Sequence, residues 1–211
     1  AYLVGHREFW SLDLKVSPDT LIPRPETELL VELALRQIPL DATWCVADLG
    51  TGSGALALSL AKERPNCRIT ATEHSPAALV IARANAARHA IGNVEFILGD
   101  WWQPLGDRRF HIALSNPPYI PDTDPHLQQG DLPWEPRAAL ASGADGLDAV
   151  RCIVSTACAH LRPGGWLLLE HGYDQGAAVR GLLQDTEMVD IETHRDLAAQ
   201  DRATWCRYQG S

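Results

Sequence analysis

A stiff loop rich in hydrogen-bond acceptors is the stretch of this chain best suited to chemistry. It consists of Ser115, Asn116, Pro117, Pro118 and Tyr119. The loop follows the apolar run 110–114, which predicts a buried strand, and open α/β sheets hold ligands at the carboxyl ends of their strands. Two prolines fix φ and remove two backbone donors, so carbonyl acceptors remain beside an amide and an aromatic ring. The combination suits a planar group with N–H donors, such as an amide or an aromatic amine. A proline-rich surface turn is the alternative for the loop alone.

A glycine-rich loop lies between the first predicted strand, 44–49, and a predicted helix, 55–64. It contains Asp48, Gly50, Thr51, Gly52, Ser53 and Gly54. Glycines let the backbone turn sharply and approach a ligand, and a helix start presents free N–H groups. The spacing Gly-x-Gly-x-Gly differs from the dinucleotide fingerprint Gly-x-Gly-x-x-Gly. The loop therefore predicts a nucleotide-like cofactor, with a merely tight turn as the alternative.

Acidic residues follow the next two predicted strands. Glu73 ends the second strand, where a carboxylate can accept from both ribose hydroxyls. Asp100 and Trp101 follow the third strand, and they offer an acceptor for an adenine amino group and an indole that lines the ring. An Asp turn beside a core tryptophan is the alternative for this pair. Acceptors at the ends of three strands, with Asn116 as the third, form a more specific pattern than any one of them.

The order of the predicted elements indicates an α/β fold. Strands are predicted at 44–49, 69–73, 94–98, 110–114 and 166–170. Helices are predicted at 55–64, 76–89, 147–161 and 175–184. We expect Gly164 and Gly165 to end the third helix before its strand. This alternation means a mostly parallel sheet with helices on both faces, and the segments 188–194 and 203–208 are predicted to finish the sheet as an antiparallel pair.

The chain is predicted to divide into an arm and one larger domain. Residues 1–20 alternate loosely and are expected to form a hairpin or linker arm, and residues 21–211 carry the motifs. The chain begins without Met, so we expect it to be one part of a longer protein. The segment 120–146 holds four prolines and little periodicity. A segment that long between elements is usually functional, with a flexible insertion as the alternative.

The charge of the chain argues against nucleic acid as a direct partner. The formal net charge is −9, and Lys15 and Lys62 are the only lysines. Affinity for naked nucleic acid depends largely on phosphate neutralisation by Lys and Arg, so no direct nucleic-acid partner is expected. A basic or neutral protein partner fits better.

Cysteine usage and hydropathy indicate a cytoplasmic protein. The five cysteines include no Cys-x-x-Cys pair, so neither a disulfide framework nor a metal site is expected. No apolar run approaches the ~20 residues that span a bilayer, and residues 1–10 lack the apolar stretch of a signal peptide. We therefore expect no association with a membrane.

Several motifs together resemble one enzyme family. The glycine loop, Glu73 and the loop 115–119 are similar to those of S-adenosylmethionine-dependent methyltransferases that modify planar nitrogens. Three further stretches, 21–28 with Ile-Pro-Arg-Pro-Glu-Thr-Glu, 134–147 and 168–172, resemble the HemK/PrmC family. That family methylates the glutamine side-chain amide in the Gly-Gly-Gln motif of class I peptide-chain release factors. The resemblance covers essentially the whole chain and makes 21–211 the methyltransferase catalytic domain.

The resemblance implies a fold and a set of contacts. The fold is the Rossmann-like fold of class I S-adenosylmethionine-dependent methyltransferases, a mostly parallel seven-stranded sheet with a final antiparallel strand and an N-terminal hairpin or linker. The implied S-adenosylmethionine contacts are Gly50, Thr51, Gly52, Ser53, Gly54, Glu73 and Trp101. Asp100 and Asn116, which stand at the ends of two predicted strands, are expected as further contacts. The family more often has Asp where Glu73 stands, and its members carry a small helical domain before the position at which this chain begins.

The implied glutamine-binding residues are Asn116, Pro117, Pro118 and Tyr119, of which Asn116, Pro117 and Tyr119 are the expected catalytic residues. We expect the Asn116 side-chain oxygen and the Pro117 carbonyl each to accept one N–H bond of the amide, with Tyr119 packed on its plane. Transfer to a poorly nucleophilic amide nitrogen then depends on positioning. No residue is an obvious general base.

Other readings stay open from the sequence. An adenine-N6 DNA methyltransferase or a ribosomal-protein glutamine methyltransferase would also suit the loop 115–119. An NAD-binding oxidoreductase and a cofactor-binding module without catalysis are further alternatives. His171 and His194 are interpreted as structural. Arg24, Glu135 and Arg137 are candidates for shaping the substrate entrance, with a structural ion pair as the alternative.

Overall fold

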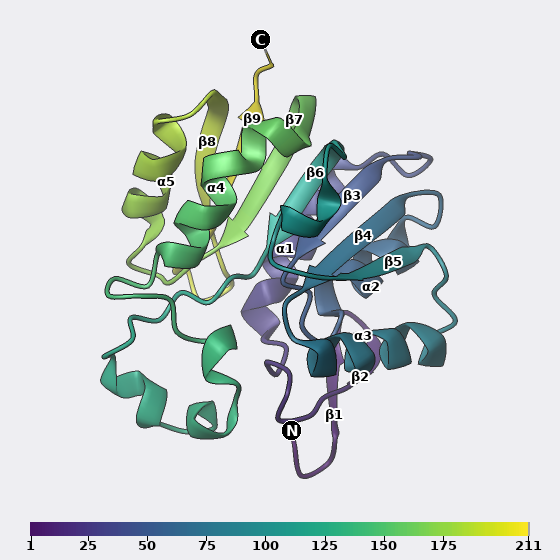
Figure 1. Ribbon diagram of the computed structural model, residues 1–211, viewed down its shortest axis with the longest axis vertical. Helices are drawn as coiled ribbons and strands as arrows, with labels where there is room; N and C mark the ends of the chain where they lie inside the picture. The colour runs from purple at the N-terminus through teal and green to yellow at the C-terminus, as the bar shows by residue number, and fades with distance from the viewer. Residues whose placement is uncertain (211) are drawn as a thin grey trace.

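Seven strands form one sheet in the order β5-β4-β3-β6-β7-β9-β8 (Figure 1). The structure is a computed structural model that describes residues 1–210. The strands are β3 (Cys45–Leu49), β4 (Arg68–Glu73), β5 (Val94–Leu98), β6 (Phe110–Ser115), β7 (Leu161–Glu170), β8 (Met188–Arg195) and β9 (Asp201–Tyr208). Strands β3 to β7 pair in parallel, and β9 runs antiparallel to both β7 and β8. The predicted mostly parallel sheet and its antiparallel ending are confirmed.

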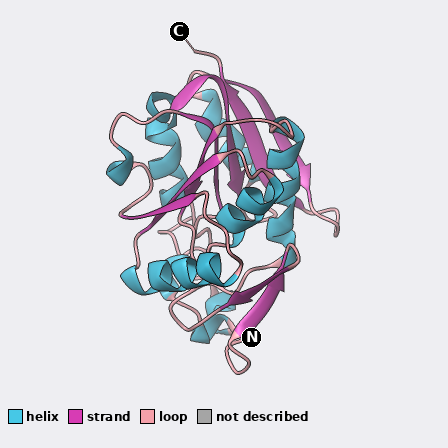
Figure 2. Ribbon diagram, turned by 90° about the vertical axis from the view of Figure 1, so that its right-hand side faces the viewer, coloured by secondary structure: helices cyan, strands magenta, loops and turns pink. Residues whose placement is uncertain are grey.

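Helices cover both faces of this sheet, as Figure 2 shows from the side. They are α1 (Glu28–Gln37), α2 (Ala55–Glu63), α3 (Pro76–Arg88), α4 (Asp148–His160) and α5 (Gly176–Gln184). Successive residues of a strand pack into two different cores, one on each face of the sheet. Val46 and Leu168 pack in the core that contains α1 and α2, whereas Ala47 and Leu167 pack in the core that contains α4 and α5. Burial on both faces explains why the strands read as nearly continuous apolar runs. None of the helices in residues 1–210 has the length and apolar character needed to cross a membrane.

The boundary between α4 and β7 differs from the prediction. Helix α4 ends at His160 and β7 begins at Leu161, so Gly164 and Gly165 lie within the strand and do not end the helix. A Cβ on Gly165 would lie 2.8 Å from the Arg162 carbonyl oxygen and 3.0 Å from that of Phe110. The glycine is therefore explained by close approach of the backbone, where the pairing of β6 with β7 is irregular.

The N-terminal segment forms the expected hairpin, β1 (His6–Phe9) with β2 (Leu12–Lys15). Phe9, Leu12 and Leu14 are buried in the same core as α1 and α2. The Asn85 side chain on α3 accepts from the Lys15 N–H at 2.7 Å and donates to the Lys15 carbonyl at 3.0 Å. The hairpin is thus packed against the larger part of the chain, below the sheet in Figure 1. A division of the chain at residue 20 stays a prediction.

The segment 120–146 is built from short turns. It contains the single 3-10 turns η3 (Pro125–Gln128), η4 (Leu132–Trp134) and η5 (Arg137–Ala139), and two others, η1 (Pro25–Thr27) and η2 (Gln103–Leu105), lie elsewhere. Ile120 and Ala141 pair in an isolated bridge, which closes the segment at its base. In Figure 1 the segment projects from the end of the sheet at which the parallel strands finish. It therefore borders the edge where a ligand is expected.

We predict that Leu14→Ala destabilises the whole chain, and not the hairpin alone. The Leu14 side chain is 0% exposed in the shared core, and truncation of a fully buried leucine costs about 2–4 kcal/mol. Urea unfolding followed by far-UV circular dichroism measures the loss, and Glu8→Ala on the exposed side of the hairpin serves as control. A single unfolding transition with unchanged midpoint in Leu14→Ala would show that the hairpin does not share the core.

Candidate active site

A cavity of about 530 Å³ opens at the carboxyl ends of β3, β4 and β6. Nine of the residues expected at the site line it, namely Gly50, Thr51, Gly52, Ser53, Glu73, Asp100, Trp101, Asn116 and Pro118. Gly54, Pro117 and Tyr119 are not among the lining residues. Gly54 precedes the first residue of α2, and Pro117 is buried. The parallel sheet thus brings loops from distant parts of the sequence to one cavity, as expected for its strand ends.

The glycine loop is held in a conformation that only glycine adopts easily. Gly50 has φ +74°, and a Cβ there would lie 2.9 Å from a ring carbon of Trp101. The Gly50 and Thr51 N–H groups both donate to the Thr72 carbonyl at 2.9 Å. Because Gly50 has no side chain, the Trp101 indole packs directly on the loop backbone and forms one wall of the cavity.

Asp48 fixes this loop to the start of α2. Its Oδ2 accepts from the Thr51 hydroxyl at 2.5 Å and from the Ala57 N–H at 3.0 Å. The carboxyl is fully buried, and Oδ1 has no hydrogen-bond partner among the described residues. Burial raises the pKa of Asp48 to about 7, although the bonds from Thr51 and Ala57 act in the opposite direction. The sequence places Asp48 in the loop but does not reveal this supporting role.

Glu73 connects the glycine loop to the end of β4. Its Oε2 accepts from the Gly52 N–H and its Oε1 from the Ser75 N–H, each at 2.8 Å. A carboxylate has about four lone-pair sites, so the group can still accept from hydroxyls in the cavity. Asp100 is more exposed, and its carboxylate lies 3.0 Å from Nδ1 of His74. One acid therefore lies in the cavity wall, and the other lies at the rim.

The loop after β6 is anchored where it leaves the strand. The Ser115 hydroxyl donates to the Leu49 carbonyl at 2.7 Å, which ties the loop to β3. The Asn116 Nδ2 donates to the Thr27 hydroxyl oxygen at 3.1 Å, and Oδ1 makes no hydrogen bond with the described residues. Both Asn116 and Thr27 line the cavity. The amide oxygen is therefore available to a donor that enters the cavity.

Tyr119 is turned away from the cavity toward the interior. Its hydroxyl donates to Glu170 Oε1 at 3.4 Å, and its carbonyl accepts from the Gln175 side chain at 2.9 Å. Glu170 is 1% exposed, and burial raises its pKa to about 7. Burial also raises the pKa of Tyr119, with the Glu170 charge acting in the same direction. The expected packing of Tyr119 on a substrate amide stays a prediction.

The segment 18–27 forms a wall of the cavity, although none of its residues is among the expected cofactor or substrate contacts. Glu135, whose side chain is fully buried, holds this wall: it pairs with Arg24 and accepts from the Ile22 N–H at 3.1 Å. Arg137 instead donates to the Asp122 carbonyl at 2.8 Å within its own loop. Arg24 and Glu135 thus join two distant segments, and the Ile-Pro-Arg-Pro-Glu-Thr-Glu stretch is the signal in the sequence that marks this wall.

The two histidines considered in the sequence are engaged elsewhere. His171 is fully buried, with Nε2 2.8 Å from the Thr204 hydroxyl and Nδ1 2.9 Å from the Gly172 carbonyl oxygen. Burial lowers its pKa, which favours the neutral ring. His194 packs edge-on against Trp205 with ring centroids 4.3 Å apart. Neither histidine lines the cavity.

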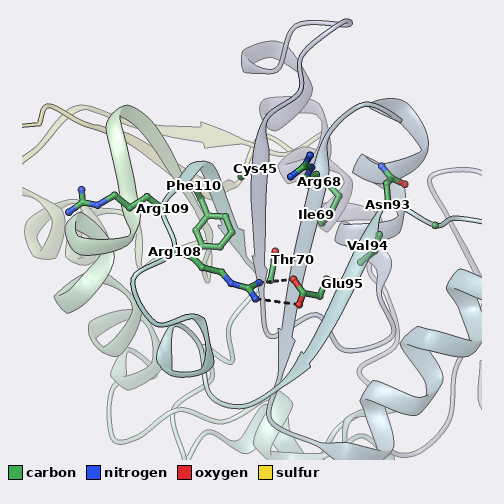
Figure 3. A pocket seen from close by; sticks show the side chains of 11 residues that line it. Cys45, Arg68, Ile69, Thr70, Asn93, Val94, Glu95, Arg108, Arg109 and Phe110 are labelled. Atoms are coloured by element: carbon green, nitrogen blue, oxygen red, sulfur yellow. Dashed lines mark hydrogen bonds and ion pairs between the residues drawn. The ribbon is translucent and has the colours of Figure 1, made fainter.

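A second cavity, of about 520 Å³, lies at the amino ends of the strands (Figure 3). Three of its four charged side chains have partners within the protein, and the fourth, Arg68, has none among the described residues. Arg108 pairs with Glu95 at 2.6 Å, and Arg109 points away from that pair and donates to the Leu161 carbonyl at 3.2 Å. No set of free donors converges there among the described residues. The cavity at the carboxyl ends is therefore the candidate active site.

The sheet order, the helices on both faces and the cavity at the strand ends define a class I, Rossmann-like methyltransferase fold. A family model described as "Methyltransferase small domain" matches residues 26–129. The 16S rRNA N2 G1207 methyltransferase of T. thermophilus, solved in complex with AdoMet and guanosine, has a TM-score of 0.68 at 19% identity. That match covers 96% of this chain and 49% of the other, and it shows the fold alone.

Proteins with higher sequence identity to this chain identify a narrower class of methyltransferase. The chain is 56% identical to the "Release factor glutamine methyltransferase" of Xylella fastidiosa (strain Temecula1), over 100% of this chain and 76% of that protein. A solved structure, the protein-(glutamine-N5) methyltransferase (release factor-specific) of Alicyclobacillus acidocaldarius, has a TM-score of 0.55 at 28% identity, and the match covers 93% of this chain and 99% of that chain. The chain belongs to the family of release factor glutamine methyltransferases, so the resemblance found in the sequence is confirmed.

We predict that Asp48→Asn gains stability relative to the wild type as pH rises. A carboxyl with a raised folded-state pKa contributes stability that is present below its unfolded pKa of about 4 and is lost as pH rises through about 7. The asparagine oxygen can accept both hydrogen bonds but has no charge to bury. Between pH 5 and pH 8 the unfolding free energy of the variant should rise relative to that of the wild type by about 1–3 kcal/mol.

Urea unfolding at pH 5, 6, 7 and 8 measures this difference. Asp107→Asn, at an exposed position, controls for the loss of one negative charge. A difference between Asp48→Asn and wild type that stays constant with pH would show that Asp48 is not buried as a strained carboxylate.

Proposed function

We propose that this protein transfers a methyl group from S-adenosylmethionine to the side-chain amide nitrogen of the glutamine in the Gly-Gly-Gln motif of class I release factors. The observation that carries the proposal is the position of Asn116. Its amide oxygen is free at a cavity that the glycine loop also lines. Membership of the release factor glutamine methyltransferase family supports the choice of substrate. Because release factors act in translation, we place the enzyme in the cytoplasm.

The residues present fit S-adenosylmethionine. The cavity offers backbone of the loop 50–53, the Glu73 carboxylate with lone pairs to spare for ribose hydroxyls, and the Trp101 indole against Gly50. Asp100 adds an acceptor at the rim. When bound, this group supplies an electrophilic methyl on a sulfonium. The cavity is also largely preformed, because Asp48, Glu73 and the Thr72 carbonyl already hold the glycine loop.

Positioning of the glutamine amide is the main task of the protein. The amide nitrogen is a poor nucleophile because its lone pair is delocalised into the carbonyl, so orientation must supply much of the rate. The Asn116 Oδ1 and the Pro117 carbonyl would each accept one of the two N–H bonds. Both bonds strengthen as positive charge develops on the nitrogen during transfer. The nitrogen then releases a proton, which leaves to solvent.

The loop is suited to this task because it is rigid. Pro117 and Pro118 fix two φ angles, and Ser115 and Asn116 are tied to β3 and to Thr27. A rigid pair of acceptors loses little conformational freedom when the substrate binds. Tyr119 holds the far end of the loop, because its hydroxyl donates to Glu170.

The polymer that accepts the methyl group tests the proposal. The protein is incubated with S-adenosylmethionine labelled in the methyl group and with a class I release factor, a ribosomal protein mixture and double-stranded DNA in one reaction. Label is expected in the release factor alone, at the glutamine of its Gly-Gly-Gln motif, by peptide mass spectrometry. Label in adenine of the DNA, or in a ribosomal protein, would contradict the proposed substrate. A net charge of −9 weighs against the DNA outcome.

Asn116→Ala should lose turnover while it keeps the cofactor. Removal of one hydrogen-bonding group that acts in the transition state typically costs 10²–10³ in kcat, so a loss of roughly 100-fold or more is expected. The Kd for S-adenosylmethionine, measured by calorimetry, should stay within about threefold. Asp107→Asn again serves as a folded control. Methyl transfer within a few fold of the wild type would remove Asn116 from the proposed role.

Glu73→Ala should show the opposite pattern. Loss of the carboxylate removes the acceptor for ribose hydroxyls and frees the Gly52 and Ser75 N–H groups, so S-adenosylmethionine should bind at least about tenfold more weakly in calorimetry. Glu73→Gln keeps one oxygen acceptor, so its affinity for S-adenosylmethionine should lie between those of the wild type and Glu73→Ala. Unchanged affinity in Glu73→Ala would exclude Glu73 from the ribose site.

A further inference from the structure

The side chain of Gln175 joins three separate segments of the chain where the loop 115–119 ends. Its Oε1 accepts from the Gly172 N–H at 2.8 Å, and its Nε2 donates to the Tyr119 carbonyl at 2.9 Å and to the Asp145 carbonyl at 3.2 Å. A backbone N–H can only donate and a carbonyl can only accept, so these partners fix the orientation of the amide. Each polar atom of the side chain therefore has a partner.

Gln175 makes these contacts instead of the usual bond at a helix start. It is the N-cap residue of α5, a position at which a side chain commonly accepts from the first N–H groups of the helix. Within residues 1–210 the Gln175 side chain makes no capping bond of this kind. The amide is directed instead toward carbonyls 30 and 56 positions earlier in the chain. Its contacts thus serve the connection between segments and not the start of α5.

Two glycines leave room for this amide. A Cβ on Gly146 would lie 2.2 Å from the Tyr119 carbonyl oxygen and 2.8 Å from Gln175 Nε2. A Cβ on Gly172 would lie 3.0 Å from Gln175 Oε1. The backbone approaches the amide this closely because neither residue has a side chain. Gly146 in addition has φ +76°, a conformation that glycine adopts without strain.

We propose that Gln175 is a positioning residue for methyl transfer, because it fixes the far end of the loop 115–119 and through it the Pro117 carbonyl. The near end is tied to β3 through the Ser115 hydroxyl. Between the two ends, Pro117 and Pro118 fix two φ angles, and a residue before a proline is restricted as well. A loop with so few free rotations takes its position from its ends. The inference rests on the proposed function, in which the Pro117 carbonyl accepts from the substrate amide.

Tyr119 is held at two points, and Gln175 holds the one in the main chain. The Tyr119 hydroxyl donates to Glu170 at 3.4 Å, whereas the carbonyl accepts from Gln175 at the shorter distance of 2.9 Å. The same amide binds the Asp145 carbonyl, so it joins both ends of the segment 120–146. Gln175 is absent from the described residues that line the cavity. It therefore acts on the reaction only through the loop that it holds.

Substitution of the amide tests this role through kinetics. Gln175→Met keeps the length of the side chain and removes its hydrogen bonds, and Gln175→Glu places a second oxygen against two carbonyls. Each should lower kcat roughly 10–100-fold, because displacement of a positioning group by about 1 Å can cost about 100-fold. The KM for the release factor and the Kd for S-adenosylmethionine should stay within about threefold. Gln184→Met and Gln184→Glu, the same changes at an exposed position of α5, serve as controls.

Gly146→Ala displaces the same carbonyl from another side. The new Cβ would meet the Tyr119 carbonyl oxygen, so kcat should fall to a similar extent. Gly130→Ala is the matched control, because Gly130 lies in the same segment, has φ +58°, and a Cβ there would meet nothing within 4 Å. This control has the strain of a positive φ without the clash. Its kcat should stay within about threefold of the wild type.

The signal of the Pro117 carbonyl separates positioning from a general loss of structure. Pro117 and Pro118 are the only adjacent prolines in the chain, so protein labelled with ¹³C′ and ¹⁵N in proline alone gives one carbonyl–nitrogen correlation. This correlation should shift in Gln175→Met and keep its position in Gln184→Met. The carbonyl signal of Pro65, which follows α2, reports on a distant part of the fold and should be unchanged in both variants.

Full kcat in Gln175→Met, or an unshifted Pro117 correlation in that variant, would overturn the inference. The spectrum needs no substrate, so the inference and the proposed function fail separately. If the wild type methylated no release factor while the correlation shifted as expected, the proposed function would fail and the positioning of the loop by Gln175 would stand. If the wild type and Gln175→Met methylated release factors at equal rates, the inference would fail and the function would stand.

Discussion

The hydrogen bond between Asn116 and Thr27 is the contact on which the site depends. It joins residues 89 positions apart in the chain, one after β6 and one at the entry to α1. The bond uses the amide nitrogen and so leaves the amide oxygen at the cavity. The parallel sheet makes the contact possible, because its strand ends bring the loops together. The hydrogen bond from the Ser115 hydroxyl to the Leu49 carbonyl fixes the position of the loop relative to the end of β3.

Buried acids hold the rest of the site in place. Asp48 fixes the glycine loop to α2, Glu135 fixes the segment 22–24 to the segment 120–146, and Glu170 accepts a hydrogen bond from Tyr119 in the loop 115–119. Two of them, Asp48 and Glu170, each keep one oxygen without a hydrogen-bond partner among the described residues. Carboxylates in such surroundings are costly, and the need to hold the loops around the cavity in fixed positions gives a reason for that cost.

Much of this arrangement follows from the order of residues along the chain. The alternation of apolar runs and helical patterns predicts the sheet, and Glu73, Asp100 and Asn116 at strand ends meet because parallel strands end at one edge. The sequence around a residue does not show which residues from distant parts of the chain contact it. Thr27 lies in a stretch whose prolines and acids are typical of a helix start, and nothing near it in the sequence points to Asn116. Gly165 reads as a helix stop for the same reason, since its close neighbour Phe110 lies on another strand.

A crystal structure of the protein with S-adenosylhomocysteine and a peptide that carries Gly-Gly-Gln measures the central contact directly. We predict the glutamine amide nitrogen within about 3 Å of both Asn116 Oδ1 and the Pro117 carbonyl oxygen, the usual length of an N–H···O bond, with Asn116 Nδ2 still on Thr27. A glutamine side chain bound outside the cavity, or one that meets Nδ2 of Asn116, would contradict the assignment of this loop as the clamp for the substrate amide.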